Sequence, residues 1–159
     1  MVELYLLRHG VAYERDEWEG KDDELRPLTK KGIGKMEIEA KALKHFDLNL
    51  DQIISSPLTR AVQTAKIVAD ALKMEVVENK LLKPGFDQKA LATLLKEYEG
   101  TEKIVIVGHE PDFSTIIGQI IGGGAVEMRK GGIACCELST IKPPKGTLKC
   151  LLPPEWLGA

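Results

Sequence analysis

The stretch Val2-Glu3-Leu4-Tyr5-Leu6-Leu7-Arg8-His9-Gly10 is a short apolar run that ends in two basic residues and a glycine. A mostly apolar run of this length is typical of a strand covered on both faces, so we expect Val2–Leu7 to lie centrally in a sheet. Arg8 and His9 then stand at the carboxyl end of this strand. That edge is where open α/β sheets bind their ligands.

Beyond this stretch, strand-like and helix-like segments alternate. Further strands are expected at Gln52–Ser55, Met74–Glu78 and Lys103–Val107, and helices after the N-cap Thr29, from Pro57 as first residue, over Asp87–Tyr98 and after Pro111. Two more strands, Ile133–Ile141 and Thr147–Leu152, flank a turn at Pro143–Gly146 and should pair antiparallel. This order predicts a three-layer α/β/α sandwich with a mostly parallel central sheet and an antiparallel edge.

Composition and charge restrict the class of protein. A chain of 159 residues, 43% hydrophobic and 29% charged, fits one folded domain over residues 1–159 and does not resemble a disordered protein. Lys+Arg 22 against Asp+Glu 24 gives a net charge of -2, which offers no overall attraction for a nucleic acid. Any anion site must therefore be local.

Cysteine usage and hydropathy indicate a location. The three cysteines, Cys135, Cys136 and Cys150, are odd in number and lack the spacing of a disulfide framework, which favours a reducing compartment. No apolar run approaches the ~18 residues needed to span a bilayer, and the first residues lack the features of a signal peptide. We expect a cytoplasmic protein without a membrane partner.

Three expected strands end in residues that carry chemistry. Arg8-His9-Gly10 follows the first, Ser55-Ser56-Pro57 leads from the second toward Arg60, and Gly108-His109-Glu110-Pro111 follows the fourth. Carboxyl ends of parallel strands meet at one edge, so two of the three histidines and two arginines should share one crevice. This set of side chains predicts a phosphate site.

The roles follow from the chemistry of phosphoryl transfer. An imidazole can attack phosphorus and hold the phosphoryl group covalently, so His9 is the candidate nucleophile. Arg8 and Arg60 offer guanidinium forks for the charge that spreads over the phosphoryl oxygens. His109, as an imidazolium, would donate to another oxygen, and amides at the starts of the following helices add anion attraction.

A metal site is the weaker interpretation of the same residues. His9, His109 and Glu110 are zinc-ligand types, but Arg8 and Arg60 beside them would repel a cation. We therefore expect neither a metal nor another cofactor.

Several residues allow two interpretations. Glu110 is a candidate substrate-binding residue through its amide or as an acid, and a carboxylate stabilised by the helix dipole explains it equally well. Arg26 and Lys130 belong either to the pocket rim or to a solvated face. The charged stretch Glu14–Glu24, within an expected surface loop, is either solvated or a gate for a protein substrate, and His45 is expected to be structural, at a helix end.

Three segments, in this order, resemble the histidine phosphatase (phosphoglycerate mutase-like) superfamily: Arg8-His9-Gly10, the segment from Ser55 to Ala65 (SSPLTRAVQTA), and Gly108-His109. The short length and three further segments resemble its small SixA-like phosphohistidine phosphatases: Arg26-Pro27-Leu28-Thr29 with Lys31-Gly32, Gly108-His109-Glu110-Pro111-Asp112, and Lys130-Gly131-Gly132. The likeness runs from about Val2 to about Leu138. It implies a phosphorylated His9, a phosphate pocket of Arg8, Arg60 and His109, and no metal.

One departure from the family bears on the substrate. Many larger members carry a glutamate general acid where this chain has Leu81–Gly85, with Lys83 at the acid's place. The favoured substrate is therefore phosphohistidine on a protein, such as a phosphorelay component, because imidazole leaves without strong acid assistance. The alternatives are a phosphomonoesterase acting on a small phosphate ester and a phosphate- or phosphopeptide-binding module without turnover.

Overall fold

The apolar stretch that ends in Arg8 forms the central strand of a six-stranded sheet. The computed structural model describes residues 1–159. The strands are β1 (Val2–Arg8), β2 (Gln52–Ser55), β3 (Val76–Glu78), β4 (Lys103–Gly108), β5 (Ile133–Ile141) and β6 (Pro144–Leu152), in the order β3-β2-β4-β1-β5-β6. β3, β2, β4 and β1 run parallel, and β5 is antiparallel to both β1 and β6.

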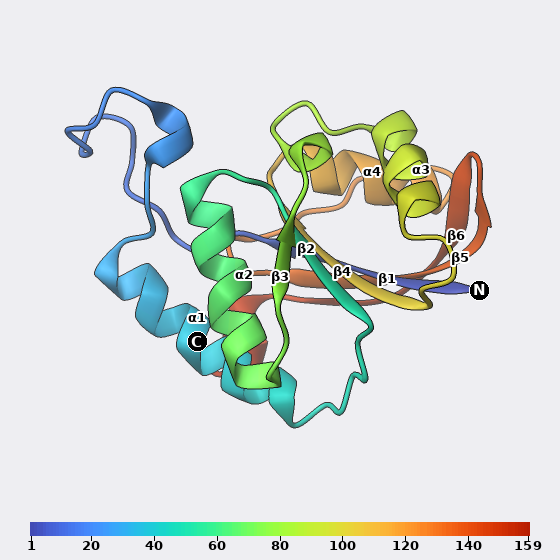
Figure 1. The fold of residues 1–159 in the computed structure, drawn as a ribbon, viewed down its shortest axis with the longest axis horizontal. Helices are drawn as coiled ribbons and strands as arrows, with labels where there is room; N and C mark the ends of the chain where they lie inside the picture. Colours follow the sequence, from blue (N-terminus) through green and yellow to red (C-terminus); the bar gives the residue numbers. More distant parts are fainter.

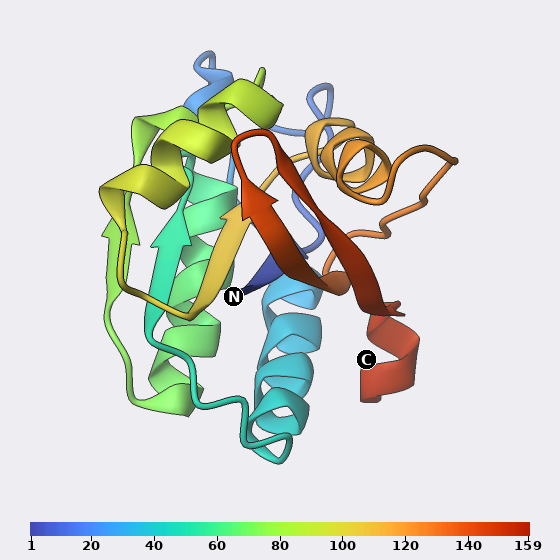
Figure 2. The ribbon, with the colours of Figure 1, turned by 90° about the vertical axis from the view of Figure 1, so that its right-hand side faces the viewer.

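Helices cover both faces of this sheet. The α-helices are α1 (Lys30–Lys44), α2 (Thr59–Leu72), α3 (Gln88–Glu97) and α4 (Asp112–Ile120), and short 3-10 turns are η1 (Asp23–Leu25), η2 (Lys80–Leu82) and η3 (Pro154–Leu157). α1 and α2 pack on one face with Leu7 and Ile53, and α3 and α4 on the other with Leu6 and Ile54 (Figure 1). Figure 2 shows the β5–β6 hairpin at the sheet edge. The predicted three-layer sandwich with an antiparallel edge is confirmed.

The starts of three elements differ from the sequence prediction by two or three residues. α2 begins at Thr59 rather than Pro57, because Leu58 keeps an extended backbone and its N–H is bonded to Ser56 Oγ at 3.3 Å. β3 begins at Val76, since the N–H of Met74 is still bonded to the Ala69 carbonyl of α2.

The turn of the hairpin is also shorter than predicted. β6 begins at Pro144, opposite Ile141, so the turn does not extend to Gly146. A proline without an N–H is tolerated there because β6 is an edge strand. The predicted N-cap Thr29 is confirmed: its hydroxyl accepts from the N–H of Gly32 at 2.9 Å.

None of the helices has the length and apolar content required to cross a membrane.

Candidate active site

The register of the sheet brings the three motif-bearing strand ends together. Arg8 of β1 is level with Gly108 of β4, and Ser55 of β2 with Val107 of the same strand. A pocket of about 440 Å³ opens at this edge. It is lined by Arg8, His9, Ala12, Glu14, Arg15, Asp23, Arg26, Arg60, Pro84, His109, Glu110 and Lys130. The structure thus brings together all five residues predicted from the motifs.

His9 is held as a neutral imidazole. Its Nδ1 lies 2.7 Å from the carbonyl oxygen of Gly10, and because a carbonyl only accepts, Nδ1 must carry the ring proton. Burial lowers the pKa of His9 to about 3, with further lowering by the charges of His109, Arg60 and Arg8, against a smaller opposite effect of the Gly10 hydrogen bond. Near neutral pH, Nε2 therefore keeps a free electron pair.

His109 stands beside His9, with ring centroids 5.3 Å apart. Its Nε2 lies 2.8 Å from Ser56 Oγ, and its Nδ1 is buried without a partner in the protein. Burial, followed by the charge of Arg60, lowers the pKa of His109 to about 4. The expectation of an imidazolium is thus wrong for the free protein, in which His109 is neutral near pH 7.

Two guanidiniums flank the histidines, that of Arg8 half-buried and that of Arg60 buried. Arg8 donates from Nη1 to the Met128 carbonyl at 2.8 Å, and Arg60 donates from Nη1 to the Asp23 carbonyl at 2.9 Å. The Nε atoms of both arginines are buried without a partner. Together with His109 Nδ1 they make up three of the four such atoms in the protein. The Nε–H groups of the two arginines are donors, and buried donors without partners are costly, so their clustering indicates a site built for an anion.

Glu110 lines the pocket but uses its carboxylate to cap α4. Its Oε1 accepts from the N–H of Ser114 at 2.8 Å, and its Oε2 from the Ser114 hydroxyl at 2.6 Å. Of the alternatives left open by the sequence, this geometry fits a carboxylate that stabilises the start of a helix.

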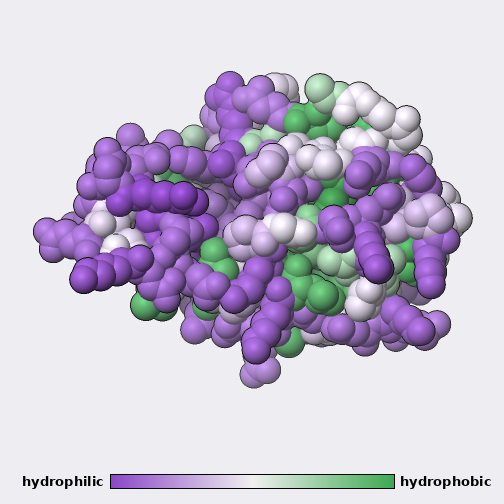
Figure 3. Space-filling model, turned by 90° about the horizontal axis from the view of Figure 1, so that it is seen from above, coloured by the Kyte–Doolittle hydropathy of each residue, from purple (hydrophilic) through white to green (hydrophobic).

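The segment of residues 13–26, called the strap below, reaches the pocket. The base of the strap is closed by a bridge between Ala12 and Leu28, and the end of the molecule that carries it is mostly hydrophilic (Figure 3, left). Its Glu14 pairs with Lys130 at 3.4 Å across the pocket rim. Lys130 and Arg26 both line the pocket, so of the two interpretations of these residues the structure supports the rim.

Asp23 is the residue of the strap that contacts most of the site's positive charge. Its carboxylate lies 2.9 Å from Arg26 Nε, 3.3 Å from Arg60 Nη2 and 3.4 Å from Arg15 Nε. Burial alone would raise the pKa of Asp23, but the Arg26 hydrogen bond and the charges of Arg60, Arg26 and Arg15 outweigh it and hold the pKa below its ordinary value. Asp23 therefore stays ionised.

The sequence reasoning missed Asp23, Arg15 and Thr64 as parts of the site. Thr64, on α2, accepts from the N–H of Gly10 at 3.0 Å and donates to the Arg60 carbonyl at 2.8 Å. It lies one turn beyond Arg60 within the Ser55–Ala65 segment, so its helical spacing from Arg60 was a usable signal. Asp23 and Arg15 gave none within the charged stretch.

Lys83 lies at the strap rather than in the pocket. Its Nζ pairs with Glu24 Oε1 at 2.7 Å, and the next residue, Pro84, lines the pocket instead. The expectation that Lys83 occupies the place of a general acid is therefore wrong for its ammonium group.

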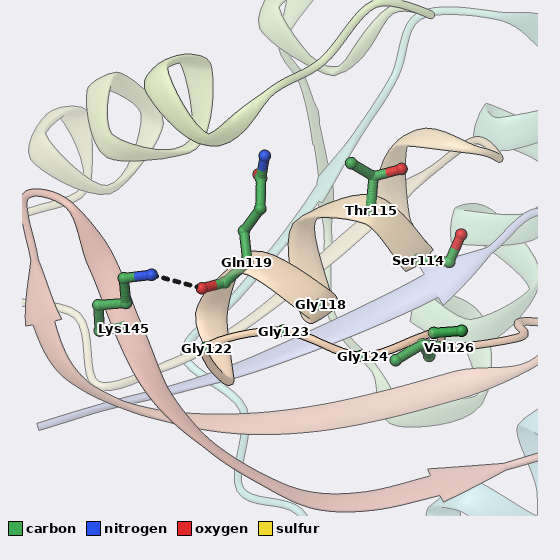
Figure 4. Close-up of a pocket in the computed structure, with 10 residues that line it drawn as sticks. Ser114, Thr115, Gly118, Gln119, Gly122, Gly123, Gly124, Val126 and Lys145 are labelled. Carbon is green, nitrogen blue, oxygen red and sulfur yellow. Dashed lines mark hydrogen bonds between the residues drawn. The ribbon is translucent and has the colours of Figure 1, made fainter.

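A larger hollow lies elsewhere and lacks this chemistry. It measures about 590 Å³ and is lined by α4 and the residues that follow it, including Gly122–Gly124 (Figure 4). Its one ionisable side chain, Lys145, donates to the Gln119 carbonyl at 2.7 Å, close to the end of α4. A cation near a helix C-terminus has a structural explanation, so the candidate active site remains at the strand ends.

Comparison with known proteins agrees with this geometry. Residues 4–83 match the family model of the histidine phosphatase superfamily (branch 1). The chain belongs to the histidine phosphatase superfamily. This membership supports a phosphatase.

The relatives of this histidine phosphatase have several names. It is 33% identical to an uncharacterized protein of Picosynechococcus sp. (98% of this chain, 99% of that protein) and 32% identical to a probable phosphoglycerate mutase, GpmB, of Proteus mirabilis (68% and 51%). It is 25% identical to the phosphohistidine phosphatase SixA of Escherichia coli (77% and 76%).

A solved structure of the protein histidine phosphatase SixA complexed with tungstate shares the fold, with a TM-score of 0.85 at 24% identity (98% of this chain, 99% of that chain). This histidine phosphatase is therefore SixA-like in sequence and fold.

Proposed function

We propose that this protein removes phosphoryl groups from phosphohistidine on a protein, through a covalent phosphohistidine intermediate at His9. The observation that carries the proposal is the state of His9. Its ring is neutral and donates a hydrogen bond from Nδ1–H to the Gly10 carbonyl, so Nε2 is available as a nucleophile in the pocket that Arg8, Arg60 and His109 also line. A nucleophile next to unpartnered donors is the arrangement that phosphoryl transfer requires.

The reaction has two displacements. In the first, His9 Nε2 attacks phosphorus of a phosphohistidine whose other ring nitrogen is protonated, and the bond from phosphorus to the substrate ring breaks so that a neutral imidazole leaves with the electron pair of that bond. The ring of His9 gains positive charge, which the Gly10 carbonyl stabilises through Nδ1–H. In the second, water attacks phosphorus, Nε2 departs with its electron pair, and the proton lost by water stays on the released phosphate.

Arg8, Arg60 and His109 serve the oxygens of the transferring group. The unpartnered Nε–H of each arginine is assigned to an equatorial oxygen. We assign the Ser56 hydroxyl as the donor to His109 Nε2, 2.8 Å away, which places the ring proton of His109 on Nδ1, where it is available to a third oxygen. Tungstate, in the related SixA structure, is an oxyanion of the same kind.

The lack of a free acid favours phosphohistidine over ordinary esters. Three carboxylates line the pocket, and each is engaged: Asp23 with three arginines, Glu110 with Ser114, and Glu14 with Lys130. An alkoxide leaving group needs a positioned proton, a contribution of typically ~10² to 10⁴ in rate. Imidazole, with a pKa near ~6.5 for its conjugate acid, leaves as a weak neutral base from a phosphohistidine ring that is already protonated on its other nitrogen, so it does not need an acid from the enzyme.

A phosphomonoesterase on small phosphate esters is the second candidate, and the likeness to a probable phosphoglycerate mutase favours keeping it. A phosphate- or phosphopeptide-binding module is a third, but a binder needs donors and no neutral nucleophile.

We place the protein in the cytoplasm, with a phosphohistidine-bearing protein such as a phosphorelay component as its partner.

Trapping the intermediate and ranking substrates tests the proposal. A phosphohistidine protein domain labelled with radioactive phosphate should label His9, and the label should be lost on incubation in water. The kcat/KM for that domain should exceed that for aryl and sugar phosphates. A sugar phosphate that matched it would favour the phosphomonoesterase, and phosphate binding without turnover of any substrate would favour the binding module.

A further inference from the structure

Asp23 contacts Arg60 in a way that divides the guanidinium into two edges. The Nη1 and Nη2 atoms of Arg60, at the end of the side chain, meet Asp23 through its carbonyl at 2.9 Å and its Oδ2 at 3.3 Å. The five N–H donors of a guanidinium have a fixed planar arrangement. With the end edge on Asp23, the side edge, formed by Nε–H and the second N–H of Nη2, remains for another acceptor.

The side edge is the one without a partner. Arg60 Nε is buried and unbonded, and the side chain of Arg60 is 5% exposed. A side edge presents two parallel donors, which matches two oxygens of one phosphoryl group. Asp23 thus occupies the part of the guanidinium that the phosphoryl group does not need.

Asp23 is itself fixed from the side opposite Arg60. Its Oδ1 accepts from Arg26 Nε at 2.9 Å, and the Arg26 side chain is only 13% exposed. Its backbone belongs to η1, whose start is capped by the carboxylate of Asp22. The guanidinium of Arg60 is thereby held at Nη1 by the backbone carbonyl of Asp23 and at Nη2 by its carboxylate, and that carboxylate is itself fixed by Arg26.

We propose that Asp23 is a positioning residue of this phosphatase, which aims the side edge of Arg60 at the transferring phosphoryl group. This inference rests on the proposed function, because it assigns Asp23 to the same reaction. The strap then contributes to catalysis through Asp23, which orients Arg60 on the neighbouring helix α2.

The proposal predicts a separation between turnover and anion affinity. Asp23→Asn removes one negative charge beside an anion pocket, so inhibition by inorganic phosphate should stay the same or become tighter. The same variant weakens the contact at Arg60 Nη2 and leaves Nη1 on the backbone carbonyl of residue 23, so the guanidinium is less firmly oriented and kcat for an aryl phosphate should fall at least ~10-fold. In Asp23→Ala, which has no side-chain acceptor at all, kcat should fall further.

Glu24→Gln is the matched control. Glu24 is the next residue of η1 and also forms an ion pair, with Lys83 at 2.7 Å, but it has no hydrogen bond or ion pair with Arg60 and does not line the pocket. Its kcat and its inhibition by phosphate should stay within twofold of wild type.

A double-mutant cycle tests whether Asp23 acts through Arg60. In the Arg60→Lys protein there is no guanidinium to aim, so adding Asp23→Asn should change kcat less than twofold. Three outcomes would overturn the proposal: an unchanged kcat in Asp23→Asn, an increased kcat, or a loss of the same factor in both backgrounds. Joint loss of kcat, phosphate affinity and thermal stability would likewise assign Asp23 a merely structural role.

The same experiment separates this inference from the proposed function. A wild-type protein that neither turns over the aryl phosphate nor labels at His9 would refute the function itself. An active, labelled wild type with an unaffected Asp23→Asn variant would refute only the role of Asp23.

Discussion

Thr64 accepts a hydrogen bond from the backbone N–H of Gly10 at 3.0 Å, while its own hydroxyl donates to the carbonyl of Arg60 at 2.8 Å. This buried hydroxyl joins the turn that carries His9 to the helix that carries Arg60. The hydroxyl of Thr64 therefore fixes the backbone of the turn that carries His9 relative to the backbone of the helix that carries Arg60. The imidazole and the guanidinium take no part in these two hydrogen bonds. Substitutions of His9 and Arg60 can consequently be interpreted as changes of chemistry at an intact site.

His9→Ala should abolish turnover and phosphoenzyme formation, because the attacking nitrogen is gone. The fold should persist, since the ring lies at a strand end and its hydrogen bond to Gly10 is local. Steady-state rates, labelling and thermal melting check this. His45→Ala, at the exposed end of α1, is the control and should behave as wild type. A well-folded His9→Ala protein with activity would rule out the covalent mechanism.

Arg60→Lys should lower kcat/KM by roughly 5- to 30-fold, or about 1 to 2 kcal/mol of transition-state stabilisation. A single ammonium cannot hold Asp23 and also present two parallel donors to a phosphoryl group. Steady-state kinetics with an aryl phosphate measure the change, and melting temperature reports on the fold. A kcat/KM within twofold of wild type would contradict the assigned role.

His9 should remain neutral at pH values where an ordinary histidine is charged. Its pKa is lowered to about 3, chiefly by burial, so NMR of the imidazole should show no protonation between pH 7 and pH 5. An unfolded chain binds this proton near pH ~6.5, so the stability that the neutral ring contributes is present above that pH and is lost as pH falls toward 3. A midpoint near 6.5 in the folded protein would show that the ring is solvated.

Chelators should leave the activity unchanged. The guanidiniums of Arg8 and Arg60 line the same pocket as the two histidines and Glu110, so their charge would repel a cation there. Rates before and after dialysis against EDTA test this. Loss of activity in EDTA that a divalent metal restores would refute the metal-free mechanism.

The preference for phosphohistidine over sugar phosphates should survive Lys83→Ala, because the ammonium of Lys83 pairs with Glu24 outside the pocket. Comparison of kcat/KM for a phosphohistidine domain, free phosphohistidine and several phosphate esters measures the preference. Glu110→Gln is the informative companion: selective loss of ester hydrolysis in that variant would make Glu110 the acid after all. Asp87 is another carboxylate, close in sequence to the segment Leu81–Gly85 where larger family members carry a general acid, but it caps α3 and does not line the pocket.

The sequence predicted the parts of the site that sit directly on strand ends. Arg8, His9 and His109 follow apolar runs, and parallel strands in register must bring such ends together. Arg60 could be added because it lies close behind a strand, at the start of a helix. The same logic predicted the layers of the fold, since the period of the apolar residues distinguishes strands from helices.

The rest depended on contacts that no local pattern encodes. Asp23 meets Arg60 37 positions away, through a charged loop without periodicity. Lys83 was placed by alignment with a motif, and only the position of Glu24 shows that its ammonium turns to the strap. The low pKa of His109 follows from burial and neighbouring cations, which exist only after the strands have assembled.

The pairing of β1 also has a consequence for how the protein folds. Glu3 pairs with Lys103, 100 positions later, and Leu7 pairs with Ile133 on the other side of the strand. Contacts between residues so far apart in sequence form slowly, because the entropy of closing a long loop is lost before the contacts contribute any stabilising free energy. We therefore expect the central strand to pair with both of its partners late in folding. His9 and His109 meet only when that closure is complete, so the appearance of phosphatase activity during refolding would mark the end of folding rather than its beginning.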